Sequence, residues 1–137
     1  TAPTGHTILL LDAAESYHRE VERTQGDMPE SVKELLPRLR DKDFTHVFVV
    51  TLPEATPVHE AERLQKDLRR AGIDPFAWVI NQSLLASGTY NPVLMERGAY
   101  ELPYIETVSQ KLSSRCALIP WIGRLPIGKE GLAALVT

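Results

Sequence analysis

The sequence predicts an α/β fold in which a short parallel β-sheet is flanked by helices. Two short apolar runs, residues 45–51 and 76–80, enclose a segment with helical periodicity, and a third apolar run follows at residues 116–119. Strands that alternate with helices at this spacing are typical of right-handed βαβ units, whose strands are parallel. The length of 137 residues predicts one domain, residues 1–137.

The first predicted βαβ unit lies between residues 45 and 81. Residues 45–51 form a β-branched apolar run, which is typical of a strand buried on both faces. Apolar residues then recur at three- and four-residue steps from Val58 to Ala71, which predicts an amphipathic helix, and Gly72 is expected to end it. Residues 76–80 are the second predicted strand, which ends at Asn81.

The remaining elements follow the same alternation. Residues 82–91 form a polar loop, residues 92–114 are helical with an interruption at Pro103, and residues 116–119 are the third strand. Residues 129–136 are the last predicted helix, and residues 29–41 are an earlier one. Three strands are few for a parallel sheet, so we expect the natural protein to supply more strands than this chain contains.

Composition excludes several classes of protein. Fifteen basic and eighteen acidic residues give a formal charge of −3, without the basic excess that indicates nucleic-acid binding. A single cysteine, Cys116, excludes a disulfide framework and a zinc site of paired cysteines, and we expect it to be a small core residue. No apolar run is long enough to span a membrane, and no signal peptide is visible, so we expect a cytosolic protein.

Asn81 is the first candidate site residue, because ligands of open parallel sheets bind beyond the carboxyl ends of the strands. Its side-chain amide can donate and accept hydrogen bonds together, which suits the edge of a purine base. The loop after Pro120 would offer backbone groups to the same ring. The alternative is that Asn81 only satisfies backbone groups of its own loop.

The N-terminal heptapeptide Thr-Ala-Pro-Thr-Gly-His-Thr is the sharpest local signal. Its small hydroxyl residues, glycine and proline leave backbone amides accessible, as a phosphate-sensing loop requires. The alternative is an ordinary helix N-cap at Thr4. The leucine-rich run at residues 8–12 favours a helix after this motif, although a strand ending in a metal-binding Asp12 is an alternative from local chemistry alone.

This heptapeptide and the leucines after it resemble the switch signature of the arsenite-pump ATPases and of their relatives that target tail-anchored membrane proteins. Residues 8–20, 50–58 and 101–106 also resemble the second half of the duplicated arsenite-pump ATPases, so the resemblance covers nearly the whole chain. It implies that residues 8–12 are helical.

The resemblance implies a deviant P-loop NTPase fold and an enzyme that hydrolyses ATP with Mg²⁺. Hydrolysis would drive the export of As(III) or Sb(III) through a membrane arsenite permease, which implies a cytoplasmic protein at the inner membrane. The switch residues implied are Thr1, Ala2 and Pro3. The adenine-binding residues implied are Asn81, Leu125 and Pro126. The implied metalloid ligand is His6.

The chain also departs from the family pattern. It has no glycine-rich loop that ends in Lys-Ser/Thr, it lacks the aspartate before the switch, and it lacks the family's cysteine ligands. We therefore expect the C-terminal portion of an ATPase domain, partnered by a missing N-terminal part and inactive alone. The alternatives are a tail-anchored targeting ATPase, against which the absence of its paired-cysteine motif counts, and a truncated nucleotide-binding module without catalysis.

Overall fold

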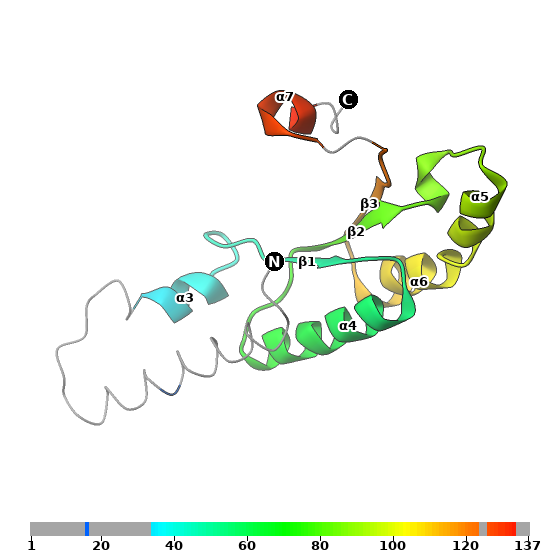
Figure 1. The fold of residues 1–137 in the computed structure, drawn as a ribbon. Helices are drawn as coiled ribbons and strands as arrows, with labels where there is room; N and C mark the ends of the chain where they lie inside the picture. Colours follow the sequence, from blue (N-terminus) through cyan, green and yellow to red (C-terminus); the bar gives the residue numbers. More distant parts are fainter. Residues whose placement is uncertain (1–15, 17–33, 124–125, 134–137) are drawn as a thin grey trace, which may run out of the picture.

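A computed structural model describes residues 16, 34–123 and 126–133 of the chain. Its centre is a three-stranded sheet in the order β1-β2-β3, with both pairs parallel (Figure 1). The strands are β1 (Phe48–Thr51), β2 (Ala77–Ser83) and β3 (Cys116–Pro120). The predicted α/β class with a short parallel sheet is confirmed.

Helices connect the strands as the sequence predicts. Before β1 lies α3 (Leu35–Arg40), between β1 and β2 lies α4 (Ala55–Arg70), and after β3 lies α7 (Gly128–Ala133). Four short elements join β2 to β3: η1 (Leu85–Ser87), α5 (Pro92–Ala99), α6 (Leu102–Thr107) and the π-helical η2 (Val108–Leu112). The predicted helices at 29–41 and 129–136 extend beyond the described residues, which contain α3 and α7.

Gly72 ends α4, as predicted, through a glycine cap. Its φ is +80°, a left-handed conformation that glycine adopts without steric strain. The N–H of Ile73 donates to the carbonyl of Leu68 at 2.9 Å, and both side chains are buried. This pattern, a backbone bond beside an apolar contact, is the usual way in which a helix end is capped before a buried strand.

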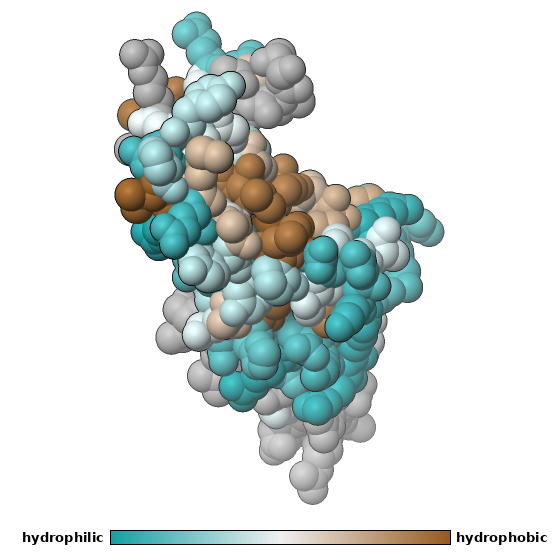
Figure 2. All heavy atoms as spheres, turned by 90° about the vertical axis from the view of Figure 1, so that its right-hand side faces the viewer, coloured by the Kyte–Doolittle hydropathy of each residue, from teal (hydrophilic) through white to brown (hydrophobic). Residues whose placement is uncertain are grey.

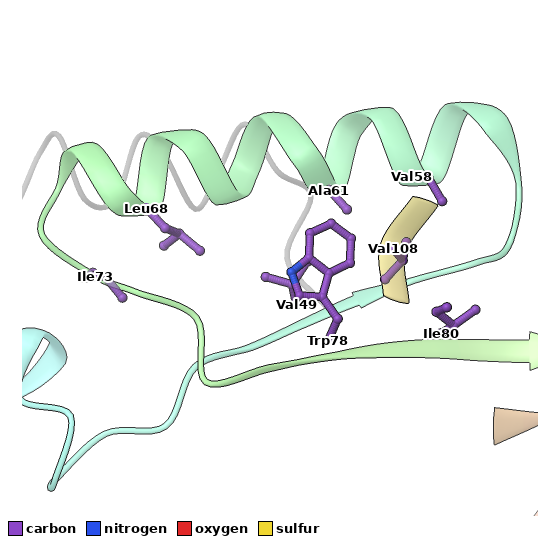
Figure 3. Close-up of a cluster of buried hydrophobic side chains, with 8 residues drawn as sticks. All are labelled: Val49, Val58, Ala61, Leu68, Ile73, Trp78, Ile80 and Val108. Carbon is purple, nitrogen blue, oxygen red and sulfur yellow. The ribbon is translucent and has the colours of Figure 1, made fainter. Parts of the chain in front are cut away.

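The hydrophobic core lies between the sheet and α4. Trp78 and Ile80 of β2 pack with Val49 of β1 and Val108 of η2, and each of the four is at most 1% exposed (Figure 3). The other members of the cluster are Val58, Ala61, Leu68 and Ile73. Burying a large apolar side chain contributes about 1.5–3 kcal/mol, so this cluster stabilises the βαβ unit. Trp78, on the second predicted strand, is thus one of the largest side chains of the core.

The prediction that the first strand spans residues 45–51 and is buried on both faces is wrong. The strand begins at Phe48, and its residues alternate between exposed and buried positions. Val49 and Thr51 face the core, whereas Phe48 and Val50 are each 52% exposed. In the described part of the chain, the helices that bury β1 cover one face of the sheet, so the side chains of the other face keep contact with solvent.

Cys116 is also not the core residue that the sequence predicts. It is the first residue of β3, an edge strand of the described sheet, and it is exposed. Among the described strands β3 pairs only with β2, and its first three residues are all exposed. Within the described residues, no helix has the length and apolar composition needed to cross a bilayer.

Candidate functional site

The ends of β2 and β3 meet at one edge of the sheet, because all three strands run in the same direction (Figure 1). Ser83 of β2 is in register with Pro120 of β3. The N–H of Trp121 donates to the carbonyl of Ser83 at 2.8 Å. The loop after β3 therefore begins directly beside the end of β2, as a shared binding edge requires.

An irregular step interrupts β2 just before it ends. The regular pairing with β3 is broken between Ile80 and Ser83, and Gln82 has a φ of +59°. This left-handed conformation is uncommon for residues other than glycine, and such residues concentrate at functional sites. The side-chain oxygen of Asn81 accepts the N–H of Gln82 at 3.0 Å. Half-buried Asn81 lies on the opposite face of β2 from Trp78 and Ile80.

A buried carboxylate holds the segment that follows this step. Glu101, immediately before α6, is 7% exposed. It accepts hydrogen bonds from the hydroxyl of Ser83 at 2.7 Å and from the N–H groups of Leu84 at 2.9 Å and Leu85 at 3.2 Å. Ser83, which is fully buried, in turn accepts the N–H of Ala86 at 3.1 Å. The end of β2 is thus tied to the start of α6.

A hollow of about 490 Å³ opens at the same edge, between the N-terminus of α4 and helices α5 and α6. Its polar lining includes Glu54, Gln82, Arg97 and Glu101, and its aromatic lining includes Tyr104 and Trp121. Trp121 is 43% exposed, so its ring is partly open to solvent. Figure 2 views the molecule from the side toward which the strands run, and hydrophobic residues gather in the upper half of that side. The hollow therefore combines charged groups with aromatic rings.

The structure describes only part of the predicted site. Asn81 lies within β2, between Ile80 and Ser83, which pair with Leu118 and Pro120 of β3. Pro126 is half-buried, with its backbone against Gly131 of α7. A Cβ atom on Gly131 would come within 2.9 Å of the Pro126 carbonyl carbon, so the two backbones touch. Thr1, Ala2, Pro3, His6 and Leu125 lie outside the described residues. Asn81 does not line the hollow, to which its neighbour Gln82 belongs.

Metal binding finds no support in the described part of the chain, where no group of three or more His, Cys, Asp or Glu side chains converges. His46 is exposed and packs against Phe76 with the ring centroids 4.2 Å apart and the rings tilted by 39°. These residues therefore do not by themselves fit Mg²⁺ or a metalloid.

Sequence reasoning did not find Gln82 or Glu101 as site residues. The sequence at Gln82 does not indicate a positive φ, because left-handed positions in turns favour glycine and asparagine. Glu101 follows an exposed helix in a polar context, where a solvated carboxylate is the ordinary expectation. The one available signal is its position directly before a helix that contains Pro103 in its first turn.

A model of the family described as "Anion-transporting ATPase" matches residues 15–122, which is more than half of the chain. The chain belongs to the anion-transporting ATPase family. Its parallel sheet and flanking helices are accordingly part of a P-loop NTPase fold. The predicted resemblance to arsenite-pump ATPases is confirmed.

Proteins named as arsenical pump-driving ATPases are close relatives. One from Escherichia coli is 49% identical over 136 residues, which cover 99% of this chain and 23% of the relative. One from Acidiphilium multivorum is 47% identical over 137 residues, which cover 100% of this chain and 23% of the relative. The Arabidopsis thaliana protein "ATPase GET3C" is 25% identical over 115 residues, with 61% of this chain and 29% of the relative covered. The chain spans about a quarter of the length of these relatives.

Proposed function

We propose that this chain supplies the adenine-binding edge and the switch segment of an ATP-hydrolysing subunit that drives arsenite or antimonite export. The observation that carries the proposal is the junction of β2 and β3, where the Trp121 N–H meets the Ser83 carbonyl beside Asn81. Identity of 49% with an arsenical pump-driving ATPase supports the same reading. The finer roles of individual residues are part of the proposal.

In this proposal Asn81 reads the edge of the adenine base. Its side-chain oxygen already accepts the N–H of Gln82, which leaves the amide NH₂ as the group available to a purine ring nitrogen. Pro126, in the loop after β3, and Leu125, its neighbour in the sequence, supply apolar contact to the ring. The switch is formed by Thr1, Ala2 and Pro3, and His6 binds the metalloid.

The phosphates and Mg²⁺ are assigned to the part of the enzyme that this chain does not contain. The chain has no glycine-rich loop ending in Lys-Ser/Thr, and such a loop is what holds the β- and γ-phosphates in P-loop enzymes. When bound, Mg²⁺ neutralises charge that develops on the phosphates. The residues of this chain bind and orient the base, and alone they are inactive.

The partners proposed are the remainder of the ATPase and a membrane arsenite permease. Such an arrangement places the protein in the cytoplasm, against the inner membrane when the permease is engaged. The alternative of tail-anchored protein targeting has less support, since the identity to ATPase GET3C is 25% against 49% for the arsenical pump-driving ATPase.

A hybrid enzyme tests the proposal. In the E. coli arsenical pump-driving ATPase, the segment that matches this chain is exchanged for the chain, and ATP hydrolysis is measured with and without antimonite. The hybrid is expected to turn over ATP, whereas the purified 137-residue chain is expected to show no turnover with Mg²⁺. A hybrid that folds but binds no nucleotide, or turnover by the chain alone, contradicts the proposal.

Asn81→Ala in the hybrid tests the adenine contact. Loss of one or two hydrogen bonds to the base is expected to raise the Kd for ATP about tenfold. Gln110→Ala is the matched control, because it removes an amide from an exposed position on η2, before the start of β3. Equal nucleotide affinity of Asn81→Ala and the control would remove Asn81 from the site.

A further inference from the structure

Glu101 is buried although a carboxylate is costly to remove from water. It is 7% exposed, and no Lys, Arg or His ion pair to it occurs among the described residues. Its two oxygens instead accept three hydrogen bonds, from the Ser83 hydroxyl and from two successive backbone N–H groups. Bonds to an ionised acceptor are short and strong, and they offset the lost hydration.

All three donors belong to the segment that follows Gln82. A left-handed residue other than glycine persists only where its surroundings over-determine the backbone. Here the chain on the C-terminal side of Gln82 is fixed at Ser83, Leu84 and Leu85 by Glu101, and at Ser83 also by the N–H of Trp121. The Glu101 carboxylate therefore maintains the strained conformation of Gln82.

The helices behind Glu101 are held close to the same segment. A Cβ atom on Gly98 of α5 would lie 2.9 Å from the Leu85 nitrogen, so the α5 backbone packs directly on η1. Because α5 and η1 are already in close contact, the helices cannot move further toward the end of β2 to restore a lost bond, and the segment after Gln82 then lacks that restraint. Asn81 and the start of the loop after β3 adjoin that end, since Asn81 lies two residues before Ser83 and the Trp121 N–H donates to the Ser83 carbonyl.

We propose that Glu101 is a positioning residue for the nucleotide site. It does not touch the base; it fixes Gln82 in its left-handed conformation, which sets the position of Asn81 and of the loop that begins at Trp121. The inference rests on the proposed adenine contact of Asn81. It adds that the affinity for the base depends on a carboxylate that does not itself contact the base.

Glu101→Gln in the hybrid ATPase tests this role. The amide keeps the shape of the side chain, but its NH₂ group donates, so at least one N–H of Leu84 or Leu85 loses its acceptor in either amide orientation. The expected result is a rise of about tenfold in the KM for ATP with kcat within about twofold, because the loss falls on base positioning. A merely structural role would lower the amount of active protein and leave the KM unchanged.

Two further variants keep the test decisive. Glu106→Gln removes the same charge from an exposed position of α6 and is expected to leave the KM unchanged. Ser83→Ala removes one of the three hydrogen bonds to Glu101 and is expected to raise the KM for ATP about threefold. This variant tests the positioning role if Glu101→Gln does not fold. Hydrogen exchange of the Leu84 and Leu85 amides in the 137-residue chain is expected to accelerate at least tenfold in Glu101→Gln.

The possible results separate the two proposals. If the unmodified hybrid binds no ATP, the proposed function fails, and exchange at Leu84 and Leu85 still shows whether Glu101 holds the strand end. If the hybrid binds ATP, and Glu101→Gln loosens these amides without changing the KM, then the positioning role is overturned. Unchanged exchange together with an unchanged KM overturns it as well.

Discussion

At the scale of single residues, Gln82 carries the most informative backbone angle of the described chain. Its φ of +59° lies in the left-handed region, which costs residues other than glycine about 1–2 kcal/mol and β-branched residues more. Glycine would occupy the same conformation without that strain, and valine would resist it. Since Gln82 is exposed, the stability of variants at this position is expected to depend on backbone geometry rather than on packing.

Gln82→Val is expected to be less stable than Gln82→Gly by about 1–2 kcal/mol. The reason is that the Val Cβ substituents clash with the backbone at positive φ. The measurement is the free energy of unfolding by urea at pH 7. Equal stability of the two variants would show that residue 82 does not adopt a left-handed conformation in solution.

Asp74 joins three segments through hydrogen bonds. One oxygen accepts from Arg69 at 3.2 Å and the other from Lys42 at 3.3 Å. The bond from Arg69, followed by that from Lys42, holds the pKa of the Asp74 carboxyl below its usual range and outweighs the opposing effect of burial. Since the side chain is half exposed, solvent screens the contribution to stability, which is small.

Asp74→Asn is expected to lower the stability slightly at neutral pH and to have no effect in strong acid. A carboxyl with a depressed folded pKa contributes stability that is fully present above its unfolded pKa of about 3.9 and is lost as the pH falls through the folded value. Unfolding free energies of both proteins between pH 7 and pH 2 check this. Asp43→Asn is the control, because it removes an exposed carboxylate outside the described ion pairs. If Asp74→Asn and the unmodified chain still differ in unfolding free energy at the lowest pH, the stabilising role of the Asp74 carboxylate is contradicted.

At the scale of elements, the two faces of the sheet differ in their packing. Val49 and Val50 are neighbours on β1, and their exposed fractions are 1% and 52%. The covered face meets α4 and η2, as the core cluster in Figure 3 shows. A helix that connects parallel strands buries one face, and a second layer is needed for the other.

Val49→Ala and Val50→Ala provide a matched pair for this asymmetry. The first is expected to cost about 2 kcal/mol, because a fully buried side chain is truncated, and the second about 0.5 kcal/mol or less. Thermal and urea unfolding of the two variants give both values. Similar costs for the two changes would mean that the open face is packed in solution.

At the scale of the whole molecule, the described sheet ends at β1 on one side and at β3 on the other. Strand edges with unpaired backbone groups, next to an exposed apolar face, are a template for association with another chain. The chain spans about a quarter of its relatives, in which further chain is available to pair and cover these surfaces. The edges and the open face of the described sheet are therefore the surfaces through which the chain is expected to associate.

The purified chain is expected to self-associate as its concentration rises from micromolar to millimolar. Size-exclusion chromatography with light scattering measures the mass at each concentration. Val50→Lys is expected to reduce the association, because a charge is introduced on the open face, and Val93→Lys on exposed α5 is expected to change it little. A monomer at every concentration would contradict the expectation.

Several features of the fold followed from local patterns. The run before Thr51, the periodicity of α4 and the glycine at 72 predicted a βαβ unit, because alternation and helix caps depend on neighbouring residues alone. The second strand was predicted to end at Asn81, whereas β2 continues to Ser83, and the adenine contact of Asn81 stays a prediction. Which face of β1 is buried was not predictable, since a β-branched run looks alike in a strand covered once or twice.

The sequence by itself determined the strand–helix order, the parallel direction of the strands and the family, because each depends on residue types at fixed spacings. Only the tertiary structure decided that Glu101 holds the end of β2, that Gln82 is left-handed and that Cys116 is exposed. These features depend on contacts between residues far apart in the chain and on which surfaces other elements cover. Such contacts leave no periodic trace in the sequence.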